Sequence, residues 1–463
     1  MSSLPRSTPE AQSLSADALD SFVAALDASE QEIQTMVLVR HGQIVLAEEW
    51  APYRLTDRHM LFSVSKSFTS MAIGLLIGAG QLSLDDQVIS FFGSDELPEK
   101  ISDNLAAMKV RHLLTMTTGH SEDTVERLTR DRRMVGIFLG LEVEVEPGTL
   151  FVYNSGATYL LSAILQKVTG ETLLDYLRPR LFEPLGATEA TWDSSREGIT
   201  TGGWGLNLNT ESLAKFGQLL LQRGEWDGKQ LIPAEWVDAA TSKQVPNDNQ
   251  DNPDWKRGYG LQFWRARHGA YRADGAFGQY CLVFPEQDAT LVITSASADM
   301  QATLDIVWEH LLPVFEGATG DGTQRPTRLQ ILPPKGAVPT GNGRTYRFEP
   351  NQAMLVSARL DADGTGTFTF STTAGLWETA VEKSQDIVCA PGDWRESTDE
   401  LTDPPARMVT SAYADGDAFV ATFRYLETPF AVTMTCRTDD DALVIDGLNN
   451  VGFGPATYTL RST

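Results

Sequence analysis

The chain has 463 residues, 42% of them hydrophobic and 21% charged, a composition typical of a globular protein with two or three domains. The formal net charge of −25 disfavours nucleic acid and anionic membranes as partners, because both bind basic surfaces. The three cysteines form no C-x-x-C pair, so neither a zinc ribbon nor a redox motif is indicated, and a disulfide framework is not expected.

The first thirty residues bear on the compartment. They are polar and acidic, without the basic segment and the apolar segment of a signal peptide. Nowhere does an apolar run reach the length of a membrane span. We therefore expect a cytoplasmic protein.

The N-terminal part begins with a predicted hairpin. β-prone runs at 35–40 and 43–47 flank the turn His41-Gly42. Phe62 then ends an extended stretch, and a helix that is apolar on nearly all sides begins at Ser63. Such a helix belongs in the middle of a domain rather than on its surface.

Helical patterns dominate residues 103–241. One helix covers 160–168 and ends before Gly170, because glycine suits the position after a helix. An amphipathic pattern running to Leu221 predicts a surface helix, which contains Ser212-Leu213-Ala214-Lys215.

Strands return at 258–264, 279–284 and 290–295, and a last helix follows at 300–312. Strands at both ends with helices between them predict an α/β (α+β) domain, residues 1–315. Its sheet is built from sequence-distant halves, and a helical region at about 100–240 is inserted.

The last third of the chain differs in composition and in its pattern of apolar residues. Residues 316–344 are rich in Gly, Pro and Thr and predict a linker. Beyond them, apolar and polar residues alternate at 366–371, 418–424 and 430–435. This period predicts an all-β accessory domain, residues 345–463, folded as a barrel or sandwich.

Ser63-Val64-Ser65-Lys66 carries the first chemical signal. A serine hydroxyl is a poor nucleophile unless a base removes its proton. On a helix the lysine three residues later lies on the same face, and burial would lower its pKa so that it can be that base. Ser212 to Lys215 repeats the pattern, so Ser63 needs support from other segments.

Tyr153 is the candidate for a second acid or base. It lies in a glycine-containing loop directly before a predicted helix, where polar side chains can be held in a cleft. We expect nearby cationic groups to stabilise its phenolate.

The third segment is Ala273-Asp274-Gly275-Ala276-Phe277-Gly278, which leads into a strand. Its glycines allow a substrate to approach an edge-strand backbone. Acyl transfer requires two N–H groups directed at the oxyanion, and the candidates are the backbone N–H groups of Ser63 and Ala276.

These segments, in this order, resemble the serine β-lactamase/penicillin-binding-protein superfamily, in its class C-like branch of β-lactamase-type esterases, D-aminopeptidases and 6-aminohexanoate-oligomer hydrolases. The resemblance covers residues 30–315 and includes Asp85-Asp86-Gln87-Val88, His112 to Gly119 and Gly202-Gly203-Trp204-Gly205-Leu206. It implies an antiparallel sheet flanked by helices, plus an all-helical subdomain, with the active site between them. It also implies that Ser63 is the nucleophile, Lys66 its base, Tyr153 the second acid/base and Ala276 the second oxyanion donor.

Two departures bear on the substrate. Ser155 occupies the place of the family's substrate-binding asparagine, so Asn154, Ser155, Gly275 and Phe277 are only candidate substrate contacts. The family's third motif usually carries Lys or His before Thr/Ser-Gly, a cation that recognises the carboxylate of a β-lactam or of a D-Ala-D-Ala terminus. An aspartate at position 274 would repel that carboxylate, and only Arg272 is at hand to compensate.

The sequence thus favours a serine hydrolase that forms an acyl-enzyme on a small neutral ester or amide, without a metal or cofactor. Trp204, Trp264 and Phe277 suggest an apolar part of the substrate. A β-lactamase or a D-amino-acid peptidase or amidase is the alternative, and a catalytically silent binding protein on the same fold is another. His59 is interpreted as structural, no H-E-x-x-H spacing is present, and assembly into a homo-oligomer is left open.

Overall fold

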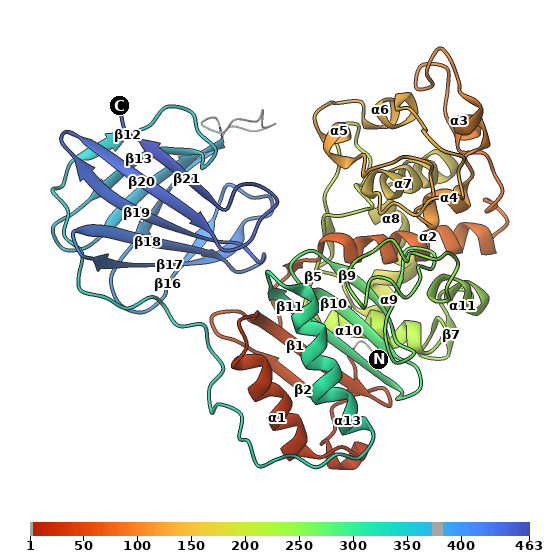
Figure 1. Ribbon diagram of the computed structural model, residues 1–463, viewed down its shortest axis with the longest axis horizontal. Coiled ribbons are helices and arrows are strands. Elements are labelled where there is room, and N and C mark those ends of the chain that lie inside the picture. The colour runs from red at the N-terminus through yellow and green to blue at the C-terminus, as the bar shows by residue number, and fades with distance from the viewer. Residues whose placement is uncertain (1–2, 373–382) are drawn as a thin grey trace. The chain divides into compact units, whose positions relative to one another are not determined.

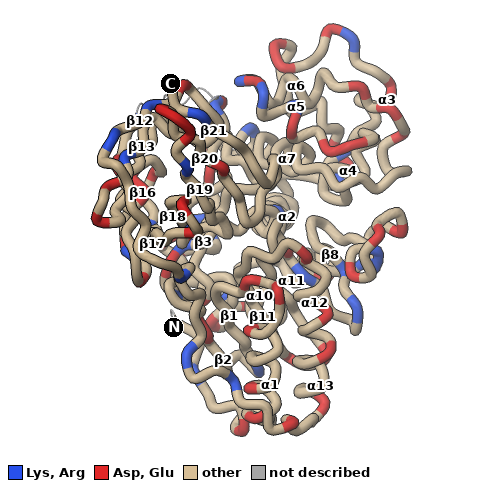
Figure 2. The backbone as a smooth tube through the Cα atoms, turned by 60° about the vertical axis from the view of Figure 1, so that its left-hand side comes forward, with Lys and Arg blue, Asp and Glu red and all other residues tan. Residues whose placement is uncertain are grey.

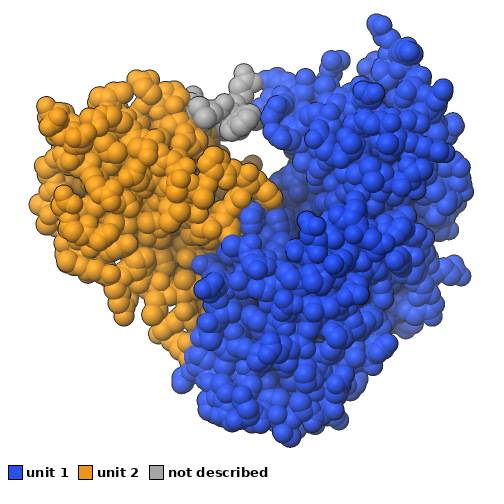
Figure 3. All heavy atoms as spheres, viewed as in Figure 1, with its two compact units in different colours: residues 1–48, 58–327 blue, residues 49–57, 328–463 orange. Residues whose placement is uncertain are grey.

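Two compact units make up the chain in the computed structural model, which describes residues 3–372 and 383–463 (Figure 3). The first comprises residues 1–48 and 58–327, and the second residues 49–57 and 328–463. Their division after residue 327 falls inside the expected linker. Residues 49–57, which the sequence analysis assigned to the first domain, belong with the second unit, where Tyr53 packs against Val409 and Leu426.

A six-stranded antiparallel sheet forms the centre of the first unit, in the order β2-β1-β11-β10-β9-β8 (Figure 1). Its strands, in chain order, are β1 (Glu32–Arg40), β2 (Gln43–Glu49), β8 (Trp264–Arg265), β9 (Tyr271–Gly275), β10 (Gln279–Phe284) and β11 (Ala289–Ala296). Val37 of β1 pairs with Val292 of β11, so the sheet joins sequence-distant halves as expected. Every residue of β10 and β11 is buried, as in a sheet that is covered on both faces.

One strand prediction was wrong. A strand was expected at 258–264, but only Trp264 and Arg265 form β8. The backbone turns at Gly258, whose φ is 110°, and a Cβ on Gly260 would lie 2.0 Å from the carbonyl oxygen of Ala240. The N–H of Gly260 donates to the carbonyl of Phe263 at 2.8 Å and Gln262 has a φ of 69°, so the chain turns here instead of extending.

Helices cover the sheet. Near the N-terminus, α1 (Ala16–Asp27) packs on β1, on α12 (Met300–Ile306) and on the π turn Val307–Leu311, which is followed by α13 (Leu312–Phe315) (Figure 1). On β10 and β11 packs α10 (Thr210–Leu221), where a Cβ on Gly217 would lie 2.2 Å from Cγ2 of Thr290. The prediction that this helix lies on the surface was wrong: Ser212 and Lys215 are only 2% and 6% exposed. Small residues such as Gly217 allow the helix to pack closely on the sheet.

The helical region packs on α2 (Ser65–Gly78) mainly through α7 (Ser155–Thr169), α8 (Leu173–Leu177) and α11 (Ala234–Thr241), and α2 also contacts β9 of the sheet. This helix is buried along nearly its whole length, as its apolar sequence predicted. The other helices of this region are α3 (Asp103–Ala107), α4 (Val110–Leu114), α5 (Val125–Thr129), α6 (Met134–Gly140) and α9 (Glu183–Leu185). Three short strands also pair, β3 (His59–Met60), β5 (Leu206–Leu208) and β4 (Thr191–Trp192), as do β6 (Glu225–Trp226) and β7 (Lys229–Gln230). Gly170 ends α7 with a φ of 76°, as predicted.

The second unit is all-β, as its alternating sequence predicted. One antiparallel sheet contains β12 (Thr345–Arg347), β13 (Leu355–Leu360), β14 (Gly366–Ser371) and β15 (Ser384–Cys389). The other contains β16 (Arg395–Asp399), β17 (Ala406–Asp415), β18 (Ala418–Tyr425), β19 (Ala431–Asp439), β20 (Ala442–Asn449) and β21 (Thr457–Arg461). Both sheets contribute to one core, in which Phe368 and Phe370 meet the ring of Phe423 at 5.2 and 5.5 Å.

The chain is strongly acidic. Aspartate and glutamate residues are spread over both units (Figure 2), in keeping with 62 acidic and 37 basic residues in the chain. In the described part of the chain, none of the helices has the length and apolar character that crossing a membrane requires.

Candidate active site

Ser63 lies on a tight turn at the entrance of the buried helix α2. Residues Phe62–Val64 form one turn of 3₁₀ helix directly before α2, and Phe62 adopts a φ of 47°. The hydroxyl of Ser65 donates to the carbonyl of Phe62 at 2.5 Å and accepts from the backbone N–H of Leu206 at 3.1 Å. These bonds fix the turn, and they leave Ser63 partly exposed at a helix N-terminus.

Lys66 lies directly beneath Ser63 and is 1% exposed. Its Nζ is 2.9 Å from Oγ of Ser63, 3.1 Å from Oγ of Ser155 and 2.8 Å from the carbonyl oxygen of Gly203. Burial lowers the pKa of Lys66 to about 8, against the opposing effect of the carboxylates of Asp123 and Asp274. A minor fraction of Lys66 is therefore the neutral amine near physiological pH, far more than for an ordinary lysine.

Tyr153 closes the group from the loop before α7. Its side chain lies beside Ser63, and Nζ of Lys66 lies 4.8 Å from the centre of its ring. The ring stacks on Trp264 at 5.1 Å. The phenolate expectation was wrong: burial and the nearby Asp274 raise the pKa of Tyr153 above its ordinary value, so the phenol keeps its proton.

The segment His112 to Gly119 supports the Tyr153 loop from below. The carbonyl of Met116 accepts from the N–H of Val152 at 2.9 Å, and its sulfur accepts from the N–H of Asn154 at 3.3 Å. A further bond runs from Gly148 N–H to the carbonyl of Thr117 at 2.8 Å. These hydrogen bonds hold the backbone of the Tyr153 loop in place.

The turn between β9 and β10 lies against the turn that carries Ser63. A Cβ on Gly275 would be 2.1 Å from the carbonyl oxygen of Leu61, and the ring of Phe277 packs edge-on against that of Phe62 at 5.5 Å. Phe277 has a φ of 64°, and its carbonyl accepts from Ser297 N–H and from Ser295 Oγ, both at 2.9 Å. Ala276 is held within this rigid turn. The two-residue strand β8 pairs only with Tyr271 and Arg272, so it does not cover the end of β9 at Gly275.

Arg272 and Asp274 form a buried ion pair on β9. Nε of Arg272 donates to Oδ2 of Asp274 at 2.8 Å, and the two side chains are 0% and 5% exposed. The guanidinium lies 4.4 Å from the Trp255 ring and also donates to the carbonyl of Asp254 at 3.0 Å. Asp274 is thus neutralised within the protein and does not face a substrate as a free charge. Arg272, the candidate replacement for the family's Lys or His, is itself held in this ion pair.

The two candidate substrate contacts after Tyr153, Asn154 and Ser155, differ in exposure. Asn154 is completely buried and caps α7: its Oδ1 accepts from Ala157 N–H at 3.3 Å and from the hydroxyl of Thr124 at 2.8 Å. This side chain stabilises the helix start, and a contact of Asn154 with substrate stays a prediction. Ser155 is partly exposed, and its hydroxyl is one of the three acceptors around Lys66.

Asp123 escaped the sequence analysis. Its Oδ1 accepts from the N–H of Ser155 at 2.9 Å and from that of Val125 at 3.0 Å. Of the charged groups that act on Lys66, this carboxylate raises the lysine pKa most. The one sequence signal is its place four residues after the His112 to Gly119 segment, which carries the resemblance.

The exposed side chains define the opening of the site. Five residues are partly exposed around the buried Lys66: Ser63, Tyr153, Ser155, Ala276 and Phe277. A carbonyl group can therefore reach Oγ of Ser63 while the base stays out of water. Trp204, also partly exposed, stacks on Tyr159 at 6.5 Å, and Trp264 is buried behind Tyr153.

The histidines and other metal-binding residue types form no comparable site. Over residues 3–372 and 383–463, no three His, Cys, Asp or Glu side chains lie together so that they could hold a metal ion. His59 is buried, burial lowers its pKa to about 3, and neither ring nitrogen has a partner, so it is a neutral core residue.

Comparison with known proteins bears on the same region. The family model described as Beta-lactamase matches residues 19–311. The 6-aminohexanoate-dimer hydrolase of Paenarthrobacter ureafaciens is 26% identical over 309 residues, which cover 61% of this chain and 78% of that protein. The lovastatin esterase of Penicillium rubens is 27% identical over 171 residues, which cover 32% of this chain and 42% of that protein.

A solved structure extends the likeness to the second unit. The octameric penicillin-binding protein homologue of Pyrococcus abyssi has a TM-score of 0.53 at 16% identity and covers 95% of this chain and 97% of that one. At this identity the likeness concerns the fold alone. The family match spans more than half of the chain and includes both turns that meet at Ser63. The chain therefore belongs to the Beta-lactamase family, a family of serine hydrolases.

Proposed function

We propose that this protein hydrolyses a carboxylic ester or amide of a small molecule through an acyl-enzyme on Ser63, with Lys66 and Tyr153 as acid/base groups. One observation carries the proposal: Nζ of the buried Lys66 lies 2.9 Å from Oγ of the accessible Ser63. A nucleophile in contact with a buried amine is the arrangement by which serine is activated without histidine.

The three contacts of Nζ can accommodate both protonation states of Lys66. An uncharged amine has two N–H groups and one lone pair. The carbonyl of Gly203 and the hydroxyl of Ser155 accept the two N–H groups, at 2.8 and 3.1 Å. In the ammonium the third N–H donates to Oγ of Ser63; once that proton is lost, the lone pair faces the Ser63 hydroxyl and can accept its proton.

Acylation then follows from these positions. Oγ of Ser63 bonds to the carbonyl carbon of the substrate as its proton moves to Nζ of Lys66. The carbonyl oxygen becomes negative and receives the backbone N–H groups of Ser63 and Ala276. When the intermediate collapses, the bond to the leaving oxygen or nitrogen breaks. That atom takes the phenolic proton of Tyr153, and the ammonium of Lys66 returns a proton to Tyr153.

Deacylation reverses these transfers. Water attacks the acyl carbonyl and gives up a proton to the same pair of groups, and Ser63 departs with a proton while the acid is released. A neutral Tyr153 suits this role, because a phenol whose pKa is raised by burial holds its proton until a basic leaving atom forms.

The charges around Ser63 favour a substrate without a carboxylate beside the scissile bond. Arg272 is paired with Asp274 and is 0% exposed, so it offers no free guanidinium to an anion. Asp123 adds a negative charge next to Ser155. We therefore expect penicillins and cephalosporins, which carry such a carboxylate, to be poor substrates.

Nitrophenyl esters of short acids test the proposal. The wild-type protein should hydrolyse them, and Ser63→Ala should lower kcat/KM by about 10⁴-fold or more, since the nucleophile is lost. Ser212→Ala is the matched control in the second S-x-x-K segment, and it should retain activity. Equal rates in wild type and Ser63→Ala would refute the proposal.

An amide is the second candidate substrate. The relative from Paenarthrobacter ureafaciens is named for hydrolysis of a 6-aminohexanoate dimer, whereas the one from Penicillium rubens is named as an esterase. A panel of esters, β-lactams, D-amino-acid amides and short polyamide oligomers distinguishes these classes. Turnover of none of them, with no acylation of Ser63, would favour a silent binding protein on the same fold.

A further inference from the structure

A buried glutamine, Gln279, lies behind the turn that carries Ala276. It is the first residue of β10, is 0% exposed and has no part in the chemistry described above. The register of β10 with β11 begins one residue later, where Tyr280 lies opposite Ile293. At this end of the sheet the side chain of Gln279 reaches β11.

The side-chain amide of Gln279 bonds Ser295 of β11 as a peptide group would. Its Nε2 donates to the carbonyl of Ser295 at 2.7 Å, and its Oε1 accepts from the N–H of Ser295 at 3.2 Å. The second N–H of Nε2 donates to the carbonyl of Ala276 at 3.1 Å. Exchanging the oxygen and nitrogen of this amide would break all three bonds, so its orientation is defined. The side chain thus continues the ladder between β10 and β11 and ties the turn to it.

The other carbonyls of the turn are also held from β11 and the residues after it. Oγ of Ser295 lies 2.9 Å from the carbonyl oxygens of both Phe277 and Gly278 and shares its proton between them. The N–H of Ser297 donates to the carbonyl of Phe277 at 2.9 Å. Phe277 has a φ of 64°, which is uncommon for a residue with a side chain. The three consecutive carbonyls of residues 276–278 therefore all have partners on this side of the turn.

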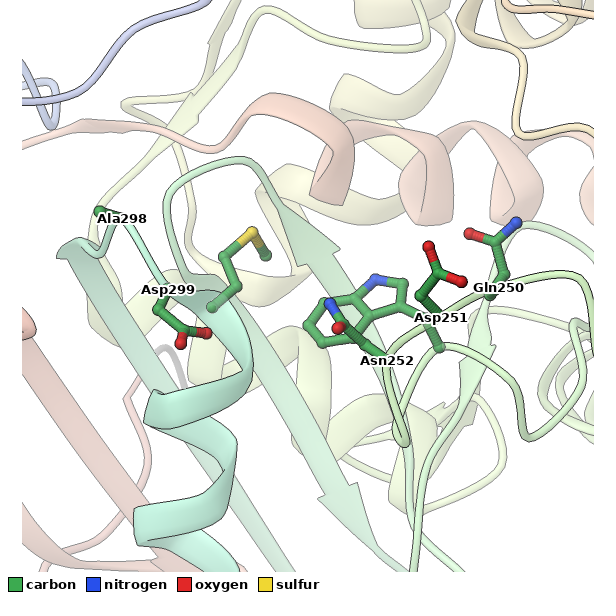
Figure 4. A pocket seen from close by; sticks show the side chains of 7 residues that line it. Gln250, Asp251, Asn252, Ala298 and Asp299 are labelled. Carbon is green, nitrogen blue, oxygen red and sulfur yellow. The ribbon is translucent and has the colours of Figure 1, made fainter.

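The segment after Ser297 is not packed on all sides. Residues 298–300, which lead from β11 into α12, line an open cavity of about 640 Å³, and Figure 4 shows Ala298 and Asp299 at its border. Oγ of Ser297 lies 2.9 Å from Oγ1 of Thr303 in α12, and the side chain of Asp299 caps this helix. Hydrogen bonds rather than close packing thus hold the support of the turn in place.

The N–H of Ala276 is left free by this arrangement. Among residues 3–372 and 383–463 it donates to no protein group, and Ala276 is partly exposed. The peptide before it is fixed at Gly275, which pairs with Gln279 and lies against the carbonyl of Leu61. The peptide after it is fixed by the bond from Gln279. Because both neighbouring peptides are fixed, this N–H points in one direction before substrate arrives.

We propose that Gln279, together with Ser295, is a positioning residue of the oxyanion site. It fixes the backbone that presents the N–H of Ala276, and it thereby stabilises the tetrahedral intermediate on Ser63 without touching the substrate. This role rests on the proposed function. A donor aimed in advance at the oxyanion stabilises the transition state more than the bound ester, so its misalignment should lower kcat rather than raise KM.

Gln279→Met tests this role, because methionine has the length of glutamine and makes none of the three bonds. We expect kcat/KM for a nitrophenyl ester to fall by about 10- to 100-fold, which is less than the loss of a whole oxyanion donor causes. The rising limb of the pH profile should stay in place, because the substitution removes no charge that acts on Lys66. Ser295→Ala, which removes the hydroxyl from Phe277 and Gly278, should cost about threefold.

Two ketones separate positioning from a general loss of structure. A trifluoromethyl ketone adds to the serine and gives a tetrahedral adduct with a negative oxygen, whereas the methyl ketone of the same shape binds without addition. In Gln279→Met the inhibition constant of the trifluoromethyl ketone should rise by about tenfold or more, and that of the methyl ketone by less than about twofold.

Gln218→Met is the matched control. Gln218 is 2% exposed and lies on α10 beside Gly42, in the turn between β1 and β2. That turn is at the other end of the sheet, where Arg40 pairs with Ala289. The same substitution of a buried glutamine should therefore leave both inhibition constants unchanged.

The outcomes separate the two proposals. Equal shifts for the two ketones, or no shift for either, would overturn the positioning role, while ester hydrolysis by the wild type would leave the proposed function standing. A limb of the pH profile that moves to higher pH would assign the effect to Lys66 and overturn the role equally. Should Gln279→Met not unfold cooperatively in urea, the same two constants in Ser295→Ala decide between these outcomes. No ester hydrolysis by the wild type and no acylation of Ser63 would overturn the proposed function, and this role with it.

Discussion

The protonation of Lys66 should control the rate of ester hydrolysis. Burial lowers the lysine pKa to about 8, and only the neutral amine can accept the proton of Ser63. We therefore expect kcat/KM to rise about tenfold per pH unit up to pH 8 and to level off above it. At pH 7 about one lysine in ten is neutral, roughly 300 times the fraction at an ordinary lysine pKa.

Asp123→Asn perturbs this equilibrium with little change of shape. The Asp123 carboxylate raises the Lys66 pKa, so its removal should move the rising limb of the profile to lower pH. An asparagine Oδ1 can still accept the bond from Ser155 N–H, so the plateau should persist. Glu126→Gln is the control, since its carboxylate lies on the exposed face of α5, paired with Arg130, and its loss should leave the limb in place.

The assay is kcat/KM for an uncharged nitrophenyl ester between pH 5.5 and 9.5 at constant ionic strength. Absorbance is followed at the isosbestic wavelength of nitrophenol, so that ionisation of the product does not enter. A profile that is flat between pH 6 and 8 would refute the role of Lys66 as the base. A limb that moves to higher pH in Asp123→Asn would refute the electrostatic reasoning.

Three further predictions concern packing and stability. Gly275→Ala should abolish ester hydrolysis, because its Cβ would lie 2.1 Å from the carbonyl of Leu61, whereas Gly140→Ala, with open space around the new Cβ, should retain activity. Lys66→Met should be inactive yet more stable than wild type at pH 7, by at most about 3 kcal/mol, as judged by urea unfolding. The folded-state pKa of about 8 lies below that of the unfolded lysine, so burial costs the wild type stability below pH 8. This gain should shrink as the pH rises from 8 towards 10.5, and a gain that grows over that range would contradict the assignment. Thiol reagents should modify the cysteines only after unfolding, because all three are buried and burial raises the pKa of Cys281 to about 12; rapid modification of the native protein would contradict the structure.

Elements with strong local periodicity were predictable. The hairpin of β1 and β2, the strand β10 at 279–284 and the alternating strands of the second unit follow from side-chain patterns that repeat every two residues. The burial of α10 could not be predicted from its sequence. An amphipathic helix can be covered on its second face as well, and this depends on the layer that packs against it. The membership of residues 49–57 in the second unit rests on contacts with Val409 and Leu426, more than 350 residues away.

The candidate site was predictable to the extent that its residues lie in recognisable segments. Ser63 and Lys66 are three residues apart on one chain segment, and Tyr153 precedes a helix with a clear start. Asp123 could not be identified, because its contact with Ser155 is set by the packing of two loops. The neutralisation of Asp274 by Arg272 was also hidden, since the sequence does not show that both side chains are buried against Trp255 and Trp264.

The central claim is that Ser63 becomes nucleophilic through its contact with Lys66, and covalent trapping tests it most directly. A fluorophosphonate should add once to the folded wild-type protein, and peptide mass mapping should locate the adduct at Ser63. Ser63→Ala should take up no label, Lys66→Met should react far more slowly, and Ser212, which is buried in α10, should remain unmodified. An unlabelled wild-type protein, or an adduct that persists in Ser63→Ala, would contradict the account.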